Sequence, residues 1–146
     1  MTRVFFYHNL RDRLGGACAL ITRAWAEGKD FTLYIPDSER AQFVDRLLWV
    51  QPAQGFLPHC RADSPLAEET PVLIATDAAA LEHLPSTHSH ERLLNLDDVV
   101  PPGFGRYANV IEVVGREDSD REAARMRART YKAQGCDLQF IDRMEH

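Results

Sequence analysis

The densest group of reactive side chains in this sequence is a run of basic residues near the carboxyl end. Five cations and one acid give the segment an excess of four positive charges: Arg121, Glu122, Arg125, Arg127, Arg129 and Lys132. At about 100° per residue, a helix brings four of these cations into one stripe about 80° wide. These four are Arg121, Arg125, Arg129 and Lys132, with Ala128 on the flank and Ala123, Met126 and Thr130 opposite. The pattern predicts a cationic strip beside an inward-facing apolar edge, which could grip an anionic group. The commoner alternative is a solvated helix face whose last cations complement the helix dipole.

A second candidate lies between residues 47 and 59, where Trp49 and Phe56 flank a turn at Pro52. If a helix continues through Trp49, the indole lies about 100° beyond Leu48 and leaves the inner stripe. Rigid aromatic side chains of this kind are good interface anchors. They can equally fold back onto the sheet, and the sequence favours neither arrangement.

Catalytic and phosphate-binding motifs are absent from the sequence. Gly15-Gly16 is the only glycine pair, it falls inside a helical pattern, and neither GxGxxG nor GxxxxGK[ST] occurs. There is also no GxSxG elbow. His83, His88 and His90 lack an HExxH helix or a carboxylate at ligand spacing, so we interpret them as solvated loop histidines.

The three cysteines predict neither disulfides nor a zinc site. Cys18, Cys60 and Cys136 are odd in number and far apart, so we expect buried reduced thiols. His59 beside Cys60 is a weak thiolate–imidazole candidate, because neighbours in an extended segment point to opposite sides. The Asp97-Asp98 pair is explained by a turn.

Length and composition predict the body that must position these groups. The 146 residues, 45% hydrophobic and 27% charged with a formal net charge of −5, are typical of one soluble domain spanning residues 1–146. The longest apolar runs are far shorter than the ~20 residues of a membrane span, and the start lacks a signal-peptide pattern, so we expect a cytoplasmic protein. The negative charge opposes a dedicated nucleic-acid binder.

Hydrophobic periodicity predicts an α/β layer fold. Helices are expected at 12–27, 38–48 and 119–134, the last beginning with a capping box at Ser119 and Glu122. Gly28 and Gly135 are the expected stops of the first and last helix. Strands are expected at 3–7, 31–35, 71–75, 93–96, 110–114 and, as an edge strand, 138–141. We therefore predict a mixed, largely parallel central sheet flanked by helices, with Rossmann-like topology and no nucleotide site.

The order and spacing of several short motifs resemble one known family, the chi subunits of the bacterial DNA polymerase III holoenzyme. The resemblance covers essentially the full chain. Its markers are Phe5-Phe6-Tyr7, Ala24-Trp25-Ala26-Glu27-Gly28-Lys29, Leu48-Trp49-x-x-Pro52, Phe56-Leu57-Pro58-His59, Leu94-Asn95-Leu96, Val100-Pro101 with Phe104, Val110-Ile111-Glu112-Val113-Val114, and Ala124-Arg125 through Tyr131-Lys132 to Gly135.

The resemblance implies a connector that catalyses nothing and needs no cofactor or metal. Chi subunits have a nucleotide-binding-like fold without a nucleotide. One surface holds the psi subunit of the clamp loader, and another binds the acidic, Pro-Phe-terminated tail of single-stranded DNA-binding protein, so DNA is reached only indirectly. Arg125 matches the key tail-binding arginine of the family, Arg121 and Arg129 match flanking basic positions, and Tyr131 and Lys132 match the end of the same helix.

The resemblance places Trp49 and Phe56 on the psi side, a surface that family members can also offer to a helicase. Members usually carry an aromatic residue where this chain has Ala128, so the apolar part of the tail pocket must be shallower or supplied by another element. The main alternative is a small α/β enzyme or nucleotide-binding protein that uses His59, Cys60 or the loop histidines. Direct binding of single-stranded DNA is a third, less favoured reading.

Overall fold

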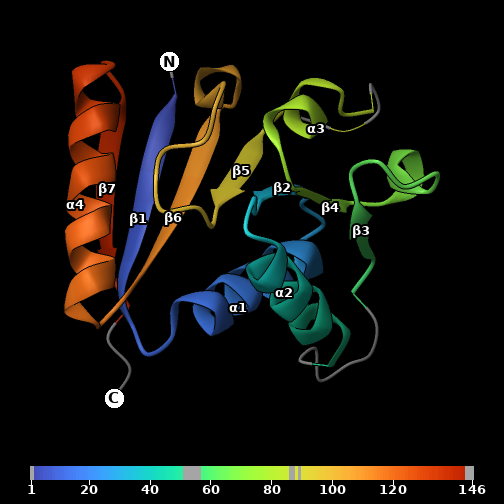
Figure 1. The fold of residues 1–146 in the computed structure, drawn as a ribbon, viewed down its shortest axis with the longest axis horizontal. Coiled ribbons are helices and arrows are strands. Elements are labelled where there is room, and N and C mark those ends of the chain that lie inside the picture. The colour runs from blue at the N-terminus through green and yellow to red at the C-terminus, as the bar shows by residue number, and fades with distance from the viewer. Residues whose placement is uncertain (1, 51–56, 86–87, 89, 144–146) are drawn as a thin grey trace.

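The centre of the molecule is a seven-stranded sheet in which every strand pairing is parallel. The computed structural model describes residues 2–50, 57–85, 88 and 90–143 (Figure 1). The strands are β1 (Arg3–Leu10), β2 (Phe31–Tyr34), β3 (His59–Arg61), β4 (Val72–Ala75), β5 (Arg92–Asn95), β6 (Asn109–Gly115) and β7 (Asp137–Asp142). Their order in the sheet is β3-β4-β2-β5-β6-β1-β7, so β7 is an edge strand paired with β1.

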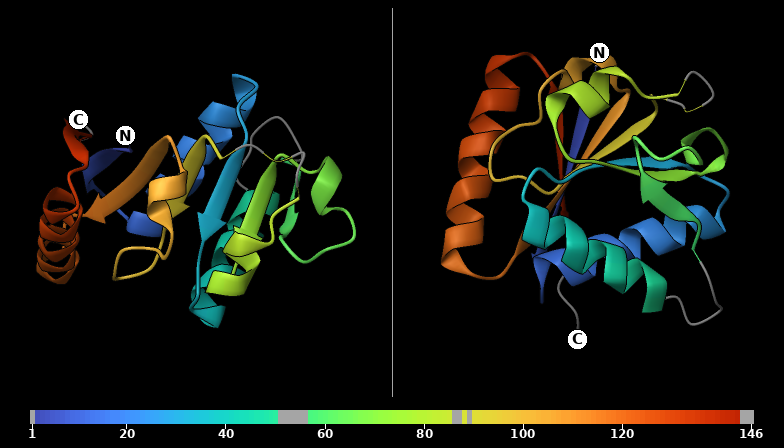
Figure 2. Two further views of the ribbon diagram at one scale, coloured as in Figure 1. Left: turned by 90° about the horizontal axis from the view of Figure 1, so that it is seen from above. Right: turned by 45° about the vertical axis from the view of Figure 1, so that its right-hand side comes forward.

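Helices cover both faces of this sheet. They are α1 (Arg13–Ala26), α2 (Ser38–Val50), α3 (Ala78–Glu82) and α4 (Asp118–Ala133), with two 3-10 turns, η1 (Ala67–Glu69) and η2 (Phe104–Arg106). Helices α1 and α2 lie on one face of the sheet, and α3 and α4 lie on the other (Figure 2). One hydrophobic core lies under α1 and α2, and a second lies under α3 and α4. Parallel strands need such crossover helices, which explains why the strands are apolar on both faces.

Strand β1 serves both cores because successive side chains of a strand point to opposite faces. Val4 and Phe6 belong to the core on the α4 side, whereas Phe5 and Tyr7 pack against the core on the α1 side. β1 lies between β6 and β7 and pairs with both, with a register shift against β6 between Tyr7 and Leu10. Successive side chains of β1 therefore face two separate sides of the sheet.

The ends of the helices follow local capping chemistry. The Asp12 side chain accepts a hydrogen bond from the Gly15 N–H at 2.8 Å and caps α1. Gly28 and Gly135 have φ of 78° and 82°, which confirms them as the left-handed residues after α1 and α4. The predicted capping box at Ser119 is wrong, because α4 begins at Asp118 with Glu117 as its N-cap, and no side-chain cap bond forms.

The α/β fold, the three long helices and six of the strands agree with the sequence prediction. Three features differ. The sheet is entirely parallel over the described residues rather than mixed, and β3 and α3 were not expected. β3 has three residues and α3 has five, which is too short for a periodicity signal to develop.

Candidate functional site

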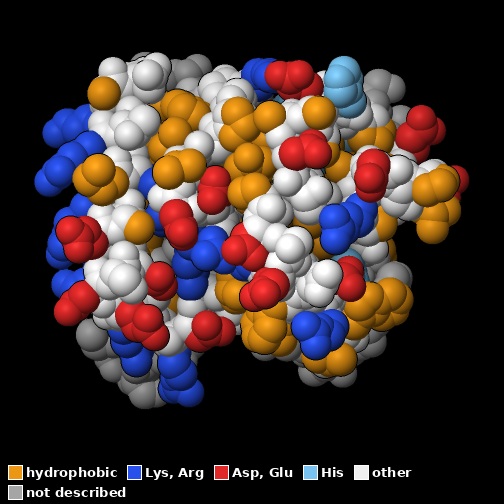
Figure 3. All heavy atoms as spheres, viewed as in Figure 1, with side chains coloured by type: hydrophobic (Ala, Val, Ile, Leu, Met, Phe, Trp, Pro, Cys, Tyr) orange, Lys and Arg blue, Asp and Glu red, His pale blue; other side chains and the backbone are white. Residues whose placement is uncertain are grey.

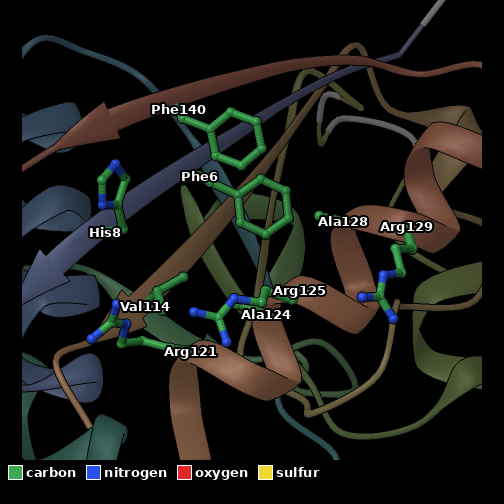
Figure 4. Close-up of a pocket in the computed structure, with 9 residues that line it drawn as sticks. All are labelled: Phe6, His8, Val114, Arg121, Ala124, Arg125, Ala128, Arg129 and Phe140. Atoms are coloured by element: carbon green, nitrogen blue, oxygen red, sulfur yellow. The ribbon is translucent and has the colours of Figure 1, made fainter. Parts of the chain in front are cut away.

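A cavity of about 520 Å³ opens between α4 and the end of the sheet (Figure 4). Its lining comes from three strands and one helix that are far apart in the sequence. The lining residues are Phe6, His8, Val114, Arg121, Ala124, Arg125, Ala128, Arg129 and Phe140. The predicted cationic strip thus borders a real hollow, and three of its four members line it.

The apolar wall of this cavity is built mainly by two phenyl rings on neighbouring strands. Phe6 of β1 and Phe140 of β7 are register partners, and their rings stack with centroids 5.3 Å apart and an interplanar angle of 21°. Phe6 is buried, whereas Phe140 is 61% exposed. In Figure 4 the two rings lie next to each other, and Ala128 of α4 lies beside the ring of Phe6. The aromatic surface that Ala128 cannot supply is therefore present on β7 and β1.

The cationic wall is provided by α4. Arg121 is 3.9 Å from Asp118 in a solvent-exposed ion pair, and Arg129 contacts the Met126 sulfur at 3.9 Å. Such exposed pairs contribute little and are easily exchanged for another partner. Within the described part of the chain, Arg125 has no carboxylate within 4.0 Å. Its guanidinium is thus available to an anionic ligand in the cavity.

Two predicted residues of α4, Arg127 of the basic run and Tyr131, lie inside the protein instead. Arg127 is 2% exposed, and its Nε donates to Oε1 of the fully buried Glu112 at 2.9 Å. Tyr131 is also fully buried, and its hydroxyl donates to Glu112 Oε2 at 2.6 Å. The Asn95 amide donates to the same oxygen at 2.8 Å. Glu112 thus ties α4 to β6 and β5 through three hydrogen bonds.

Burial governs the titration of this cluster. It raises the pKa of the Glu112 carboxyl, and Arg127, the Tyr131 and Asn95 hydrogen bonds, and Arg13 oppose the rise. Burial also raises the pKa of the Tyr131 hydroxyl, and the neighbouring Glu112 charge adds to this effect. The cluster fixes the rotation of α4 about its axis, and with it the direction in which Arg121, Arg125 and Arg129 point.

The inward edge of α4 differs from the predicted one. Ala124, Arg127 and Tyr131 are buried, whereas Met126, predicted to face inward, is 59% exposed. Arg127 therefore adds no charge to the surface. The side chain of Tyr131 is inaccessible to a ligand at the surface. Lys132 is exposed but does not line the cavity.

Four wall residues that lie on strands were missed by the sequence analysis: Phe6, His8, Val114 and Phe140. They come from strands whose neighbours in the sheet could not be deduced from periodicity. An available signal was Glu112, a lone acid in an apolar strand segment, because a buried carboxylate requires a buried cation or donor. That partner, Arg127, marks which side of the last helix faces inward.

The predicted interface aromatic Trp49 lies on a different part of the molecule, near the end of α2. Its side chain is 55% exposed and meets the His59 ring edge-on with centroids 5.4 Å apart. Phe43 and Val50 of α2 are also exposed, at 44% and 75%. Hydrophobic side chains gather over the α2 region in Figure 3. Phe56 lies outside the described residues.

The carboxyl ends of the strands, where α/β folds usually bind nucleotides, are filled by side chains of the chain itself. Arg13 donates to the carbonyl oxygens of Val113 at 3.0 Å and Asp97 at 2.8 Å, and lies 3.4 Å from the Asp98 carboxylate. Arg40 donates to the Leu96 carbonyl and also lies 3.4 Å from Asp98. The arginines replace the glycine-rich loop and its open anion site.

The other candidate groups are held in structural contacts. Both ring nitrogens of His59 are hydrogen-bonded, to the Leu57 carbonyl oxygen at 2.8 Å and the Asp45 carboxylate at 3.0 Å, which leaves no nitrogen for Cys60. The interpretation of His88 as a solvated loop residue is wrong, because it is buried and hydrogen-bonds Thr32 Oγ1 at 2.9 Å. Cys18 is buried, while Cys60 and Cys136 are only half-buried. Among the described residues, no group of three histidine, cysteine or acidic side chains could hold a metal ion.

Comparison with known proteins identifies the family. A family model described as DNA polymerase III chi subunit, HolC, matches residues 1–139. The chain belongs to the DNA polymerase III chi subunit family. It is 34% identical over 143 residues to the DNA polymerase III subunit chi of Pseudomonas aeruginosa, covering 95% of both chains. It is 27% identical to the Escherichia coli subunit chi over 83% of this chain and 79% of that one.

Membership in the chi family makes the chain an accessory subunit of the replicative polymerase. A third relative, the subunit chi of Haemophilus influenzae, is 24% identical over 84% of this chain and 81% of its own. Within the part of the chain that the structure describes, no helix is long and apolar enough to cross a membrane.

Proposed function

We propose that this chi subunit is a non-catalytic adaptor that binds the acidic carboxyl-terminal tail of single-stranded DNA-binding protein in the cavity beside α4. The single observation that supports this function is the cavity itself. It places the guanidinium of Arg125, which has no carboxylate within 4.0 Å among the described residues, opposite the stacked rings of Phe6 and Phe140. A ligand that fills both halves must carry negative charge next to a bulky apolar side chain.

The physical fit concerns the last residues of such a tail. A terminal phenylalanine carries its carboxylate and its ring on the same carbon atom, so one residue can reach both walls. The carboxylate accepts charge-assisted hydrogen bonds from arginine, and the ring packs on Phe140. Preceding aspartates lie along the exposed side of α4, where Arg121, Arg129 and Lys132 attract them at longer range.

A second surface supports the adaptor role. We propose that Trp49 and its apolar neighbours on α2 contact the psi subunit of the clamp loader, with Phe56 as a further contact. These exposed apolar residues are separate from the cavity beside α4, because none of them lines that cavity. Two partners could thus be bound at the same time, and DNA is reached through the protein that coats it.

The test is titration with a peptide that ends in acidic residues plus Pro-Phe. We expect micromolar-range binding that weakens as salt rises, and at least tenfold weaker binding for Arg125→Glu, because a charge-assisted hydrogen bond contributes roughly 1.5–3 kcal/mol. Arg61→Glu on β3 is the matched control, since Arg61 is exposed and outside the cavity. Equal binding by wild type and Arg125→Glu refutes the assignment.

The same experiment separates the two surfaces. Trp49→Ala is expected to keep the tail affinity within about twofold and to lose the psi subunit in a pull-down. If Trp49→Ala retains psi at the wild-type level, the second surface is assigned wrongly. Binding of a bare oligonucleotide as tight as that of the peptide would replace the adaptor with a direct DNA-binding protein.

A further inference from the structure

Strands β6, β1 and β7 carry a second hollowed surface, on the face opposite α4. There α1 packs against β6, and two hollows of about 270 and 360 Å³ lie between α1 and these strands. A third hollow, of about 390 Å³, lies beyond the end of α1, beside Arg92 at the start of β5. The first and central hollows share Leu20, Arg23 and Arg143, and the central and third share Lys29 and Arg92. The hollows are therefore neighbours along one surface, which is called the α1 groove below.

Each hollow of the α1 groove has an apolar part. Leu10 and Ala19 line the first hollow, Tyr7 and Ile141 line the central one, and Trp25 lines the third. Tyr7 and Ile141 are register partners on β1 and β7 and are only half-buried. The α1 groove thus offers apolar contacts on both sides of Arg23 and Arg143, the two arginines that line both the first and the central hollow.

The charges of the groove are partly neutralised. Lys29 lies 3.2 Å from Glu27, and Arg92 lies 3.8 Å from Asp30. Over residues 2–50, 57–85, 88 and 90–143, neither Arg23 nor Arg143 has a carboxylate within 4.0 Å. The Arg143 guanidinium is held over the Tyr7 ring, 5.9 Å from its centroid. The side chains of Arg23 and Arg143, neither of them paired with a carboxylate among the described residues, therefore line both the first and the central hollow.

The size and charge of the groove restrict its ligand. The lining residues that belong to α1 and its C-cap run from Gly16 to Glu27. A helix covers this stretch in about 16 Å, which is the length of about five residues of extended chain. The acids Glu27, Asp30 and Asp142 line the same groove and repel a chain of phosphates. A ligand with one negative charge at the two arginines and apolar groups on both sides avoids this repulsion.

We propose that the α1 groove binds an extended segment of a partner protein in which a single acidic residue lies between apolar residues. The acidic side chain accepts hydrogen bonds from Arg23 and Arg143, and the flanking apolar side chains occupy the first and central hollows. An internal segment fits better than a chain terminus, because the groove continues in both directions from the arginines. The proposal is independent of the cavity beside α4.

The experiment follows the backbone amide resonances of the full chain carrying Arg125→Glu, a change that removes the proposed tail site. The ligands are the pentapeptide acetyl-Leu-Ser-Glu-Ser-Leu-amide and its twin with Gln in place of Glu. We expect saturable shifts at Tyr7, Leu20 and Ile141 in the low-millimolar range with the Glu peptide, and at least fivefold weaker binding of the Gln twin.

Two variants locate the effect. Arg23→Glu is expected to weaken the Glu peptide at least fivefold, and Arg143→Gln does the same without reversing a charge. Arg61→Glu is the control and leaves the titration unchanged. Absence of saturable shifts, equal binding of the Gln twin, or an unchanged titration of Arg23→Glu overturns the proposal. The proposal is also overturned if a short thymidine oligonucleotide shifts these resonances and the Glu peptide does not, because the groove would then bind nucleic acid.

Discussion

Replacing one member of the buried pair between α4 and β6 tests whether Glu112 and Arg127 form an ion pair that holds α4 on the sheet. In Arg127→Met the side chain keeps an unbranched apolar stem but loses the guanidinium and its charge, and the Glu112 carboxylate keeps only the Tyr131 and Asn95 donors. Glu112→Gln is the complementary change. The carbonyl oxygen of the introduced glutamine can accept hydrogen bonds from Tyr131 and Asn95. Its NH2 group then faces the Arg127 Nε–H, so two donors oppose each other without an acceptor.

The structure sets the expected magnitude. Glu112 is fully buried and Arg127 is 2% exposed, so either single change leaves an unpaired group away from water. Removing one partner of a buried ion pair costs roughly 3–5 kcal/mol, and we expect a loss of that size for each single variant. The double variant removes both charges and leaves one unsatisfied amide, so it should be about 2–4 kcal/mol more stable than the sum of the single losses predicts.

The assay is equilibrium unfolding in urea for the wild type, both single variants and the double variant. Arg129→Met, at an exposed position on the same helix, is the control and is expected to change stability by less than about 0.5 kcal/mol. Glu112 and Arg127 are not an ion pair if Glu112→Gln lowers the free energy of unfolding by less than about 1 kcal/mol. The same conclusion follows if the losses of the two single variants add up to the loss of the double variant.

Two further changes have expected outcomes. Burial raises the pKa of the Cys18 thiol from 9.0 to about 12, so the folded chain retains a proton that the unfolded chain releases. Its contribution to stability is complete below pH 9 and is lost as the pH rises toward 12. Above pH 9, Cys18→Ala should therefore reduce the fall of the unfolding free energy by up to about 1.4 kcal/mol per pH unit, as measured by urea unfolding at a series of pH values. The same dependence of unfolding free energy on pH in the wild type and the variant would contradict this. Phe140→Ala removes an exposed ring and should weaken tail-peptide binding roughly fivefold with little loss of stability, whereas Met126→Ala, equally exposed but outside the cavity, should change neither.

The sequence predicted the elements of this fold because its amphipathic patterns are strong. Helix stops at Gly28 and Gly135 could be placed because their left-handed conformation depends on local backbone energetics alone. The neighbours in the sheet could not be predicted in the same way. The pairing of β7 with β1, which brings Phe140 onto Phe6, depends on contacts across more than 130 residues of chain.

The candidate site shows the same division. Helical geometry was sufficient to put Arg121, Arg125 and Arg129 on one stripe, and these three line the cavity. It left Arg127 off that stripe, but it could not show that Arg127 is buried while Arg125, two residues away, is exposed. That distinction depends on a carboxylate from β6, so it became visible only when α4 was placed on the sheet.

The alternation of β1 has a consequence for how this subunit can diverge. Phe6 and Tyr7 are adjacent in the chain, yet one belongs to the hollow beside α4 and the other to the groove beside α1. Substitutions can tune either surface separately. Inserting or deleting a single residue before Phe6 would exchange the two faces at once, so the number of residues in this strand should be held more tightly among descendants of this chain than the identity of any one of them.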